Sequence, residues 1–107
     1  MIRLKPGVCL DMLTPQMVIA ATIIDQVYAY YAVDECWITS ANDSKHSKKS
    51  FHYFGKALDI RTHNIKDSKL KTAIMEKIKL FLGEEFDVIL ESKGTSNEHI
   101  HVEWDPK

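Results

Sequence analysis

Cysteine is scarce in this sequence, and the two cysteines present have no neighbours at metal-binding spacing. Cys9 and Cys36 lie far apart in the chain, and neither belongs to a C-x-x-C pair. The spacing therefore gives no basis for a zinc site built from thiolates. Small buried thiols in a reducing compartment are the expected state of both residues, in preference to a disulfide.

Long apolar runs, a secretory leader and charge of one sign are also missing. The longest apolar stretch, from Met17 to Ile24, is too short to span a bilayer. The first seven residues lack the apolar core of a signal peptide. The formal net charge at pH 7 is −1, with no basic stripe. Neither a membrane nor a nucleic acid is therefore an expected partner, and a substrate outside the cell would require another means of delivery.

The length and composition describe one small domain over residues 1–107, with a modest core. Thr14 followed by Pro15 predicts a helix N-terminus, and apolar residues at steps of three and four extend that helix to about Tyr31. A second helix is expected from Asp67 or Ser68 to Gly83. Its expected apolar face comprises Leu70, Ala73, Ile74, Ile78 and Phe81.

Four strands are predicted, at residues 36–39, 56–61, 86–90 and 98–104, while residues 1–13 are expected to form an extended or looped lead-in. In the last strand, alternation places His99, His101 and Glu103 on one face. The other face carries Ile100, Val102 and Trp104. Such a strand has one face for the core and one face for a site.

The candidate chemistry lies in two stretches, residues 50–59 and 98–101. His52, Asp59 and His101 provide two imidazoles and a carboxylate, which suit zinc and leave a fourth position for water. Glu98 is the candidate base for that water, and His99 is a candidate to stabilise a developing oxyanion. Spacing alone leaves open a metal-free, hydrogen-bonded cluster of the same residues.

These two stretches resemble the motifs of a known family. The matching residues are Ser50-x-His52-x-x-Gly55-x-Ala57-x-Asp59, with Glu98-x-x-His101 and His99-x-His101. They resemble the zinc D-alanyl-D-alanine peptidases, which include D-Ala-D-Ala carboxypeptidases and the L-alanyl-D-glutamate endopeptidases of phage endolysins. Hedgehog signalling domains share this metal scaffold. The resemblance covers about residues 37–107.

The resemblance implies a fold, a metal centre and an activity. The fold is α+β, a mainly antiparallel sheet with helices packed on one side. The centre is Zn²⁺ held by His52, Asp59 and His101, with Glu98 as general base. The activity is hydrolysis of peptide bonds at D-amino-acid centres in peptidoglycan stem peptides by a monomeric enzyme. A phage enzyme of this type stays in the host cytoplasm until a pore releases it, or travels with the virion, and needs no signal peptide.

One departure from the family pattern concerns substrate binding. The family commonly has Thr-Ser-Gly-x-Arg ahead of its first motif, whereas residues 39–43 here read Thr-Ser-Ala-Asn-Asp. The candidate substrate-binding residues are Ser50, Lys45, His46 and Arg61. Lysine does not reproduce the bidentate fork of arginine, so substrate preference stays open. A non-catalytic zinc-binding recognition module on the same scaffold is the alternative reading.

Overall fold

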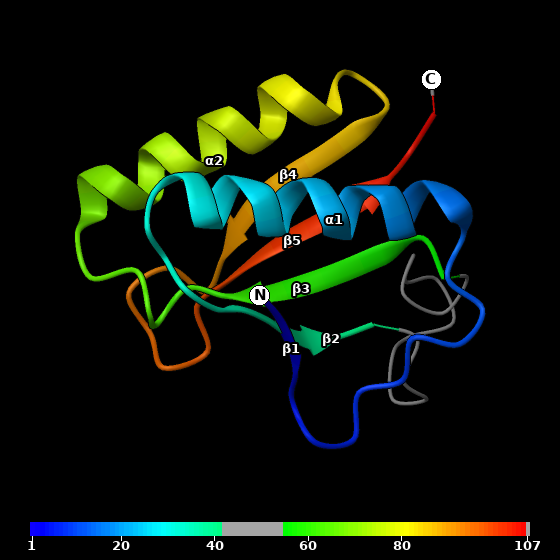
Figure 1. The fold of residues 1–107 in the computed structure, drawn as a ribbon, viewed down its shortest axis with the longest axis horizontal. Coiled ribbons are helices and arrows are strands. Elements are labelled where there is room, and N and C mark those ends of the chain that lie inside the picture. The colour runs from blue at the N-terminus through cyan, green and yellow to red at the C-terminus, as the bar shows by residue number, and fades with distance from the viewer. Residues whose placement is uncertain (42–54, 107) are drawn as a thin grey trace.

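One five-stranded sheet carries both helices on a single face (Figure 1). The computed structural model describes residues 1–41 and 55–106. The elements are β1 (Ile2–Leu4), α1 (Pro15–Tyr30), β2 (Cys36–Ser40), β3 (Ala57–Arg61), α2 (Ser68–Leu82), β4 (Phe86–Glu91) and β5 (His99–Trp104). The strand order is β1-β2-β3-β5-β4. Among the described strands only the β1–β2 pair is parallel, so the predicted α+β class with a mainly antiparallel sheet is confirmed.

Both helices begin at the capping residues that the sequence predicts. The Thr14 hydroxyl accepts a hydrogen bond from the backbone N–H of Met17 at 3.2 Å, and Pro15 occupies the first helical position of α1. The Asp67 carboxylate accepts from the backbone N–H of Lys69 at 2.9 Å at the start of α2. Gly83 then ends α2.

The core lies between the helices and the face of the sheet that they cover. α1 contributes Met17, Ala20, Ile24, Val27 and Tyr28, all buried. α2 contributes Ile74 and Ile78, and the central strands contribute Leu58, Ile60, Ile100 and Val102. Phe81 was expected on the buried face of α2, and that expectation is wrong because its side chain is 59% exposed. It lies in the last turn of the helix.

Strand register brings the polar side chains together on the face away from the helices. β3 runs antiparallel to β5, with Asp59 opposite His101 and Arg61 opposite His99. Because successive side chains alternate between faces, burying Leu58 and Ile60 against the helices turns Asp59 to the other face. The predicted division of the last strand into an apolar core face and a polar, histidine-bearing face is confirmed.

The short strand β1 was not predicted. Residues 2–4 are all exposed, and an alternation over only Ile2, Arg3 and Leu4 is too short to indicate a strand. They pair in parallel with β2, and the backbone N–H of Lys5 continues the contact by donating to Ile38 at 3.0 Å. The N-terminal segment therefore forms an edge of the sheet, beside β2.

Two further expectations can be compared with the fold. Both cysteines are free, and burial raises the pKa of the Cys36 thiol to about 12. In the parts of the chain that the structure describes, neither helix has the length and apolar character needed to cross a bilayer.

Gly55 provides a test of how β3 is anchored. Its φ is +71°, and an added Cβ would lie 2.1 Å from the backbone oxygen of Met12. Its own carbonyl accepts from the N–H of Thr14 at 3.0 Å, which joins the start of β3 to the start of α1. Gly55→Ala should therefore lower the free energy of unfolding by clearly more than the roughly 1–2 kcal/mol of left-handed strain alone.

Gly7→Ala is the matched control, because Gly7 also has a positive φ, of +90°, but nothing lies within 4 Å of an added Cβ. Chemical denaturation of both variants measures the difference. Equal losses of stability would show that the close approach to Met12 is not a constraint.

Candidate metal centre

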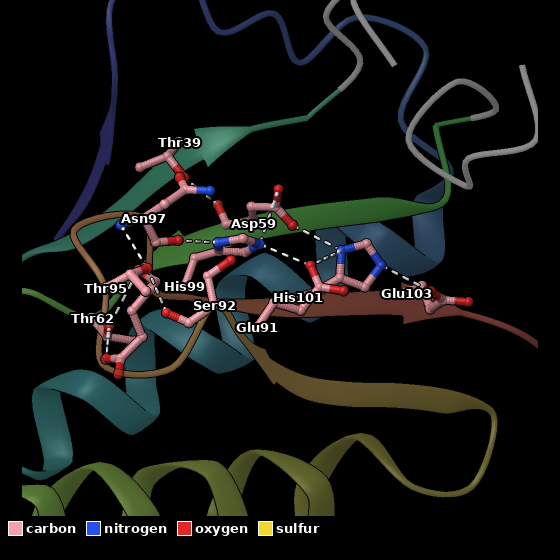
Figure 2. Close-up of polar contacts among 11 residues, drawn as sticks. Thr39, Asp59, Thr62, Glu91, Ser92, Thr95, Asn97, His99, His101 and Glu103 are labelled. Carbon is pink, nitrogen blue, oxygen red and sulfur yellow. Dashed lines mark hydrogen bonds and ion pairs between the residues drawn. The ribbon is translucent and has the colours of Figure 1, made fainter. Parts of the chain in front are cut away.

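Asp59 and His101 form the centre of the polar cluster. They face each other across β3 and β5, and Asp59 Oδ1 lies 2.8 Å from His101 Nδ1. His101 Nε2 lies 2.8 Å from Glu103 Oε1, so the imidazole sits between two carboxylates (Figure 2). Burial opposes a charge on His101, but the bonds to Asp59 and Glu103 outweigh burial and raise its pKa to about 9.

His99 lies beside this pair on the same face of β5. Its Nε2 is 2.9 Å from Glu91 Oε1 and 3.7 Å from Asp59 Oδ2. Its Nδ1 is 2.7 Å from the backbone oxygen of Asn97, which fixes the orientation of the ring. Burial lowers the pKa of His99, whereas the Asn97 carbonyl and the carboxylates of Asp59 and Glu91 raise it, and the net direction is upward.

Glu91 is a member of the cluster that the sequence analysis did not single out. It is the last residue of β4, and the β4–β5 register places it opposite His99. Ligand atoms of Asp59, Glu91 and His99 all lie within 4.8 Å of one another, and Glu91 Oε1 is 4.0 Å from His101 Nδ1. A hairpin between residues 86–91 and 99–104 brings Glu91 to the histidines, so the signal was available once those two strands were paired.

The donor set could hold a metal ion. Imidazole nitrogen and carboxylate oxygen are both ordinary zinc ligands, and the cluster offers both from rigid neighbouring strands. The structure therefore contains a group of residues that could hold a metal ion. The predicted ligand His52 lies outside the described residues, as do Ser50, Lys45 and His46.

Glu98 lies directly before β5, and its carboxylate is bound by three donors. Lys71 Nζ and Thr62 Oγ1 each lie 2.5 Å from Oε1, and the backbone N–H of Gly94 donates to Oε2 at 3.0 Å. The bonds from Lys71, Thr62 and Gly94 lower the pKa of Glu98 to about 2. The side chain is only 9% exposed. This carboxylate ties the β4–β5 turn to α2 and to the end of β3.

A small hollow adjoins the cluster. Its volume is about 220 Å³, and Asp59 and His99 form part of its wall. Arg61, the predicted substrate-binding residue that the structure describes, also lines it. The remaining lining residues are Lys5, Thr39, Ser40, His63, Ser96, Asn97 and Glu98.

Comparison of the chain with models of protein families, with curated proteins and with solved structures finds no match in any of the three. The inference about function therefore depends on the sequence motifs and on the geometry of the cluster.

The contacts of Glu98 predict a measurable effect on stability. Glu98→Gln preserves the shape of the side chain but removes the charge that faces Lys71. The free energy of unfolding at pH 7 should fall by about 1–3 kcal/mol. Because the folded-state pKa is lowered to about 2, this contribution is present above pH 4.5 and is lost as the pH falls from 4.5 toward 2.

Urea denaturation of the wild type and the variant at several pH values measures this difference. Glu76→Gln is the control, because Glu76 is exposed and lies 3.9 Å from Lys79, and it should change stability by less than about 0.5 kcal/mol. A Glu98→Gln deficit that stays constant down to pH 2 would contradict the assignment.

Proposed function

We propose that this protein is a zinc-dependent peptidase that hydrolyses peptide bonds at D-amino-acid centres of bacterial peptidoglycan. The observation that carries the proposal is the contact between Asp59 and His101 across β3 and β5, with His99 and Glu91 beside it. Asp59 and His101 lie far apart in the sequence, and both are ligands in the motif-based prediction. In the fold they are neighbours. A phage-type role in cell-wall lysis, after release through a pore or within the virion, belongs to the same proposal.

The proposed ligands are His52, Asp59 and His101. Asp59 and His101 project from the two central strands, so their separation is fixed by the backbone ladder between them. Glu103 accepts from the far nitrogen of His101 and holds the ring in place. A zinc ion bound there would polarise a substrate carbonyl and lower the pKa of a water molecule.

We assign the general base to Glu91, whereas the resemblance implies Glu98. A base must reach the attacking water and must be able to accept its proton. Glu91 Oε1 lies within the cluster, 4.0 Å from His101 Nδ1, and the side chain is half exposed. The Glu98 carboxylate is bound by Lys71, Thr62 and Gly94, which leaves it little capacity to accept a proton.

His99 is the proposed stabiliser of the tetrahedral oxyanion. Its ring is oriented by Asn97 on one nitrogen and by Glu91 on the other. The Glu91 and Asp59 carboxylates favour the protonated ring, which is the form that stabilises negative charge. Proton acceptance by Glu91 and charge stabilisation by His99 then occur within one hydrogen-bonded pair.

The competing function is a non-catalytic zinc module that recognises a partner. It requires zinc binding without hydrolysis, and the absence of the family arginine from residues 39–43 favours it. The position of Glu91 argues against it, because a structural site has no use for a half-exposed carboxylate beside the ligands.

The first experiment measures zinc content together with cleavage of defined muropeptides, before and after chelation. The proposal expects one bound zinc per chain and cleavage that is lost with a chelator and restored by zinc. Asp59→Asn and His101→Gln should each lose zinc and activity together. Zinc without cleavage of any muropeptide would favour the recognition module, and absence of zinc would overturn both readings.

A second comparison distinguishes the roles of Glu91 and Glu98. Glu91→Gln should retain zinc and reduce kcat by roughly 10²–10⁴-fold, the range for loss of a general base. Glu98→Gln should retain zinc and show a lower midpoint of unfolding, with a much smaller loss of kcat. The opposite pattern would return the base to Glu98. Glu76→Gln serves as the exposed control.

A further inference from the structure

The carboxylate of Asp59 faces two different imidazoles. Its Oδ1 lies 2.8 Å from His101 Nδ1, and its Oδ2 lies 3.7 Å from His99 Nε2. The proposed catalytic zinc requires Asp59 with His101 and His52. It does not require Glu91 and His99, which form a group with Asp59 that could hold a metal ion. The cluster therefore offers two sets of metal ligands that share one carboxylate.

The second set, Asp59, Glu91 and His99, is called the outer triad below. Glu91 Oε1 lies 2.9 Å from His99 Nε2, and Asp59 Oδ2 lies 3.7 Å from the same nitrogen. Zinc bonds to nitrogen and oxygen are about 2.0–2.2 Å long, so two ligands of a tetrahedral ion lie roughly 3.3–3.6 Å apart. The two separations bracket that spacing, so small side-chain movements bring the triad to the geometry of zinc.

Each member of the outer triad stands on a different strand. Asp59 lies on β3, Glu91 on β4 and His99 on β5, and these strands are neighbours in the sheet. His99 Nδ1 lies 2.7 Å from the backbone oxygen of Asn97, which turns Nε2 toward the other two members (Figure 2). A metal-bound imidazole commonly donates its other N–H to a backbone carbonyl in this way. The backbone and this contact therefore hold the three groups ready for a metal ion.

The outer triad is open to solvent on the side of Glu91. The Glu91 side chain is 45% exposed, whereas the His99 side chain is 15% exposed. A cation can reach the triad through this opening, and water can complete its coordination. An ion there would share Asp59 with the catalytic zinc, and the two positive charges repel each other. The second ion should therefore bind more weakly than the first.

We propose that Asp59, Glu91 and His99 form a second, weaker zinc site whose occupation inhibits the enzyme. The inference rests on the proposed peptidase function and concerns the regulation of the same site. A metal ion on Glu91 occupies the oxygen with which the proposed base accepts a proton. A metal ion on His99 removes the group assigned to the oxyanion. Activity is therefore highest with one zinc per chain and falls as the outer triad fills.

A neighbouring acidic group must be distinguished from the outer triad. Asp87, Glu103 and Asp105 also bring three carboxylate oxygens within 4.8 Å of one another. This group contains no imidazole, and Glu103 is engaged with His101 Nε2 at 2.8 Å. Asp105→Asn removes one carboxylate from the acidic group and leaves the outer triad intact. It is therefore the matched control for loss of the second zinc.

The test starts from the full chain loaded with one equivalent of zinc. Titration calorimetry with further zinc measures binding of a second equivalent, and cleavage of a defined muropeptide is followed at the same zinc concentrations. The wild type should bind a second equivalent and lose activity in parallel with its occupation. His99→Gln and Glu91→Gln should each keep the first zinc. Each should weaken the second by at least about tenfold, because even loss of a group that only supports a ligand costs that much. Asp105→Asn should keep both equivalents and the inhibition.

Binding of only one equivalent by the wild type would overturn the proposal, as would a second equivalent that both His99→Gln and Glu91→Gln bind unchanged. Loss of the second equivalent in Asp105→Asn alone would assign it to the acidic group instead. Activity that rises with the second equivalent would contradict the inhibitory role. A second zinc that depends on His99 and Glu91, in a protein that cleaves no muropeptide when singly loaded, would sustain the second site and reject the peptidase. Cleavage without a second zinc would do the reverse, so the two failures are distinguishable.

Discussion

The pairing of β3 with β5 is the constraint on which the candidate site depends. It sets Asp59 opposite His101 and Arg61 opposite His99, so the two proposed ligands and two neighbouring groups are fixed by one run of backbone hydrogen bonds. A shift of one residue would turn every one of these side chains toward the helices. The same register buries Leu58, Ile60, Ile100 and Val102. The free energy of core burial therefore maintains the geometry of the polar face.

The elements that the sequence predicts most accurately are those with a local physical cause. Thr14 and Asp67 cap their helices through their own side chains, and Gly83 ends α2 because it adopts a positive φ. The alternation of polar and apolar residues over 99–104 identifies the two faces of β5, because successive side chains of a strand point to opposite faces and only one face is packed against the core. None of these inferences requires knowledge of a distant partner.

The features that the sequence does not predict depend on distant partners. β1 has no buried side chain and exists because β2 offers an open edge. Glu91 joins the cluster because the β4–β5 register places it opposite His99. Glu98 is paired with Lys71, which lies on α2, far from Glu98 in the sequence. In a single sequence, Glu91 and Glu98 are two carboxylates near a pair of histidines. Their different surroundings appear only when the strands and α2 are placed.

Because the helices cover one face of the sheet, the apolar core and the polar cluster lie on opposite faces (Figure 1). Arg61 lies on the polar face, while its strand neighbour Ile60 is 1% exposed in the core. Exchanges at Arg61 or Lys5 therefore remove no buried apolar group and cost little folding free energy. The polar face can therefore change through single surface substitutions, without first accumulating compensating changes in the interior.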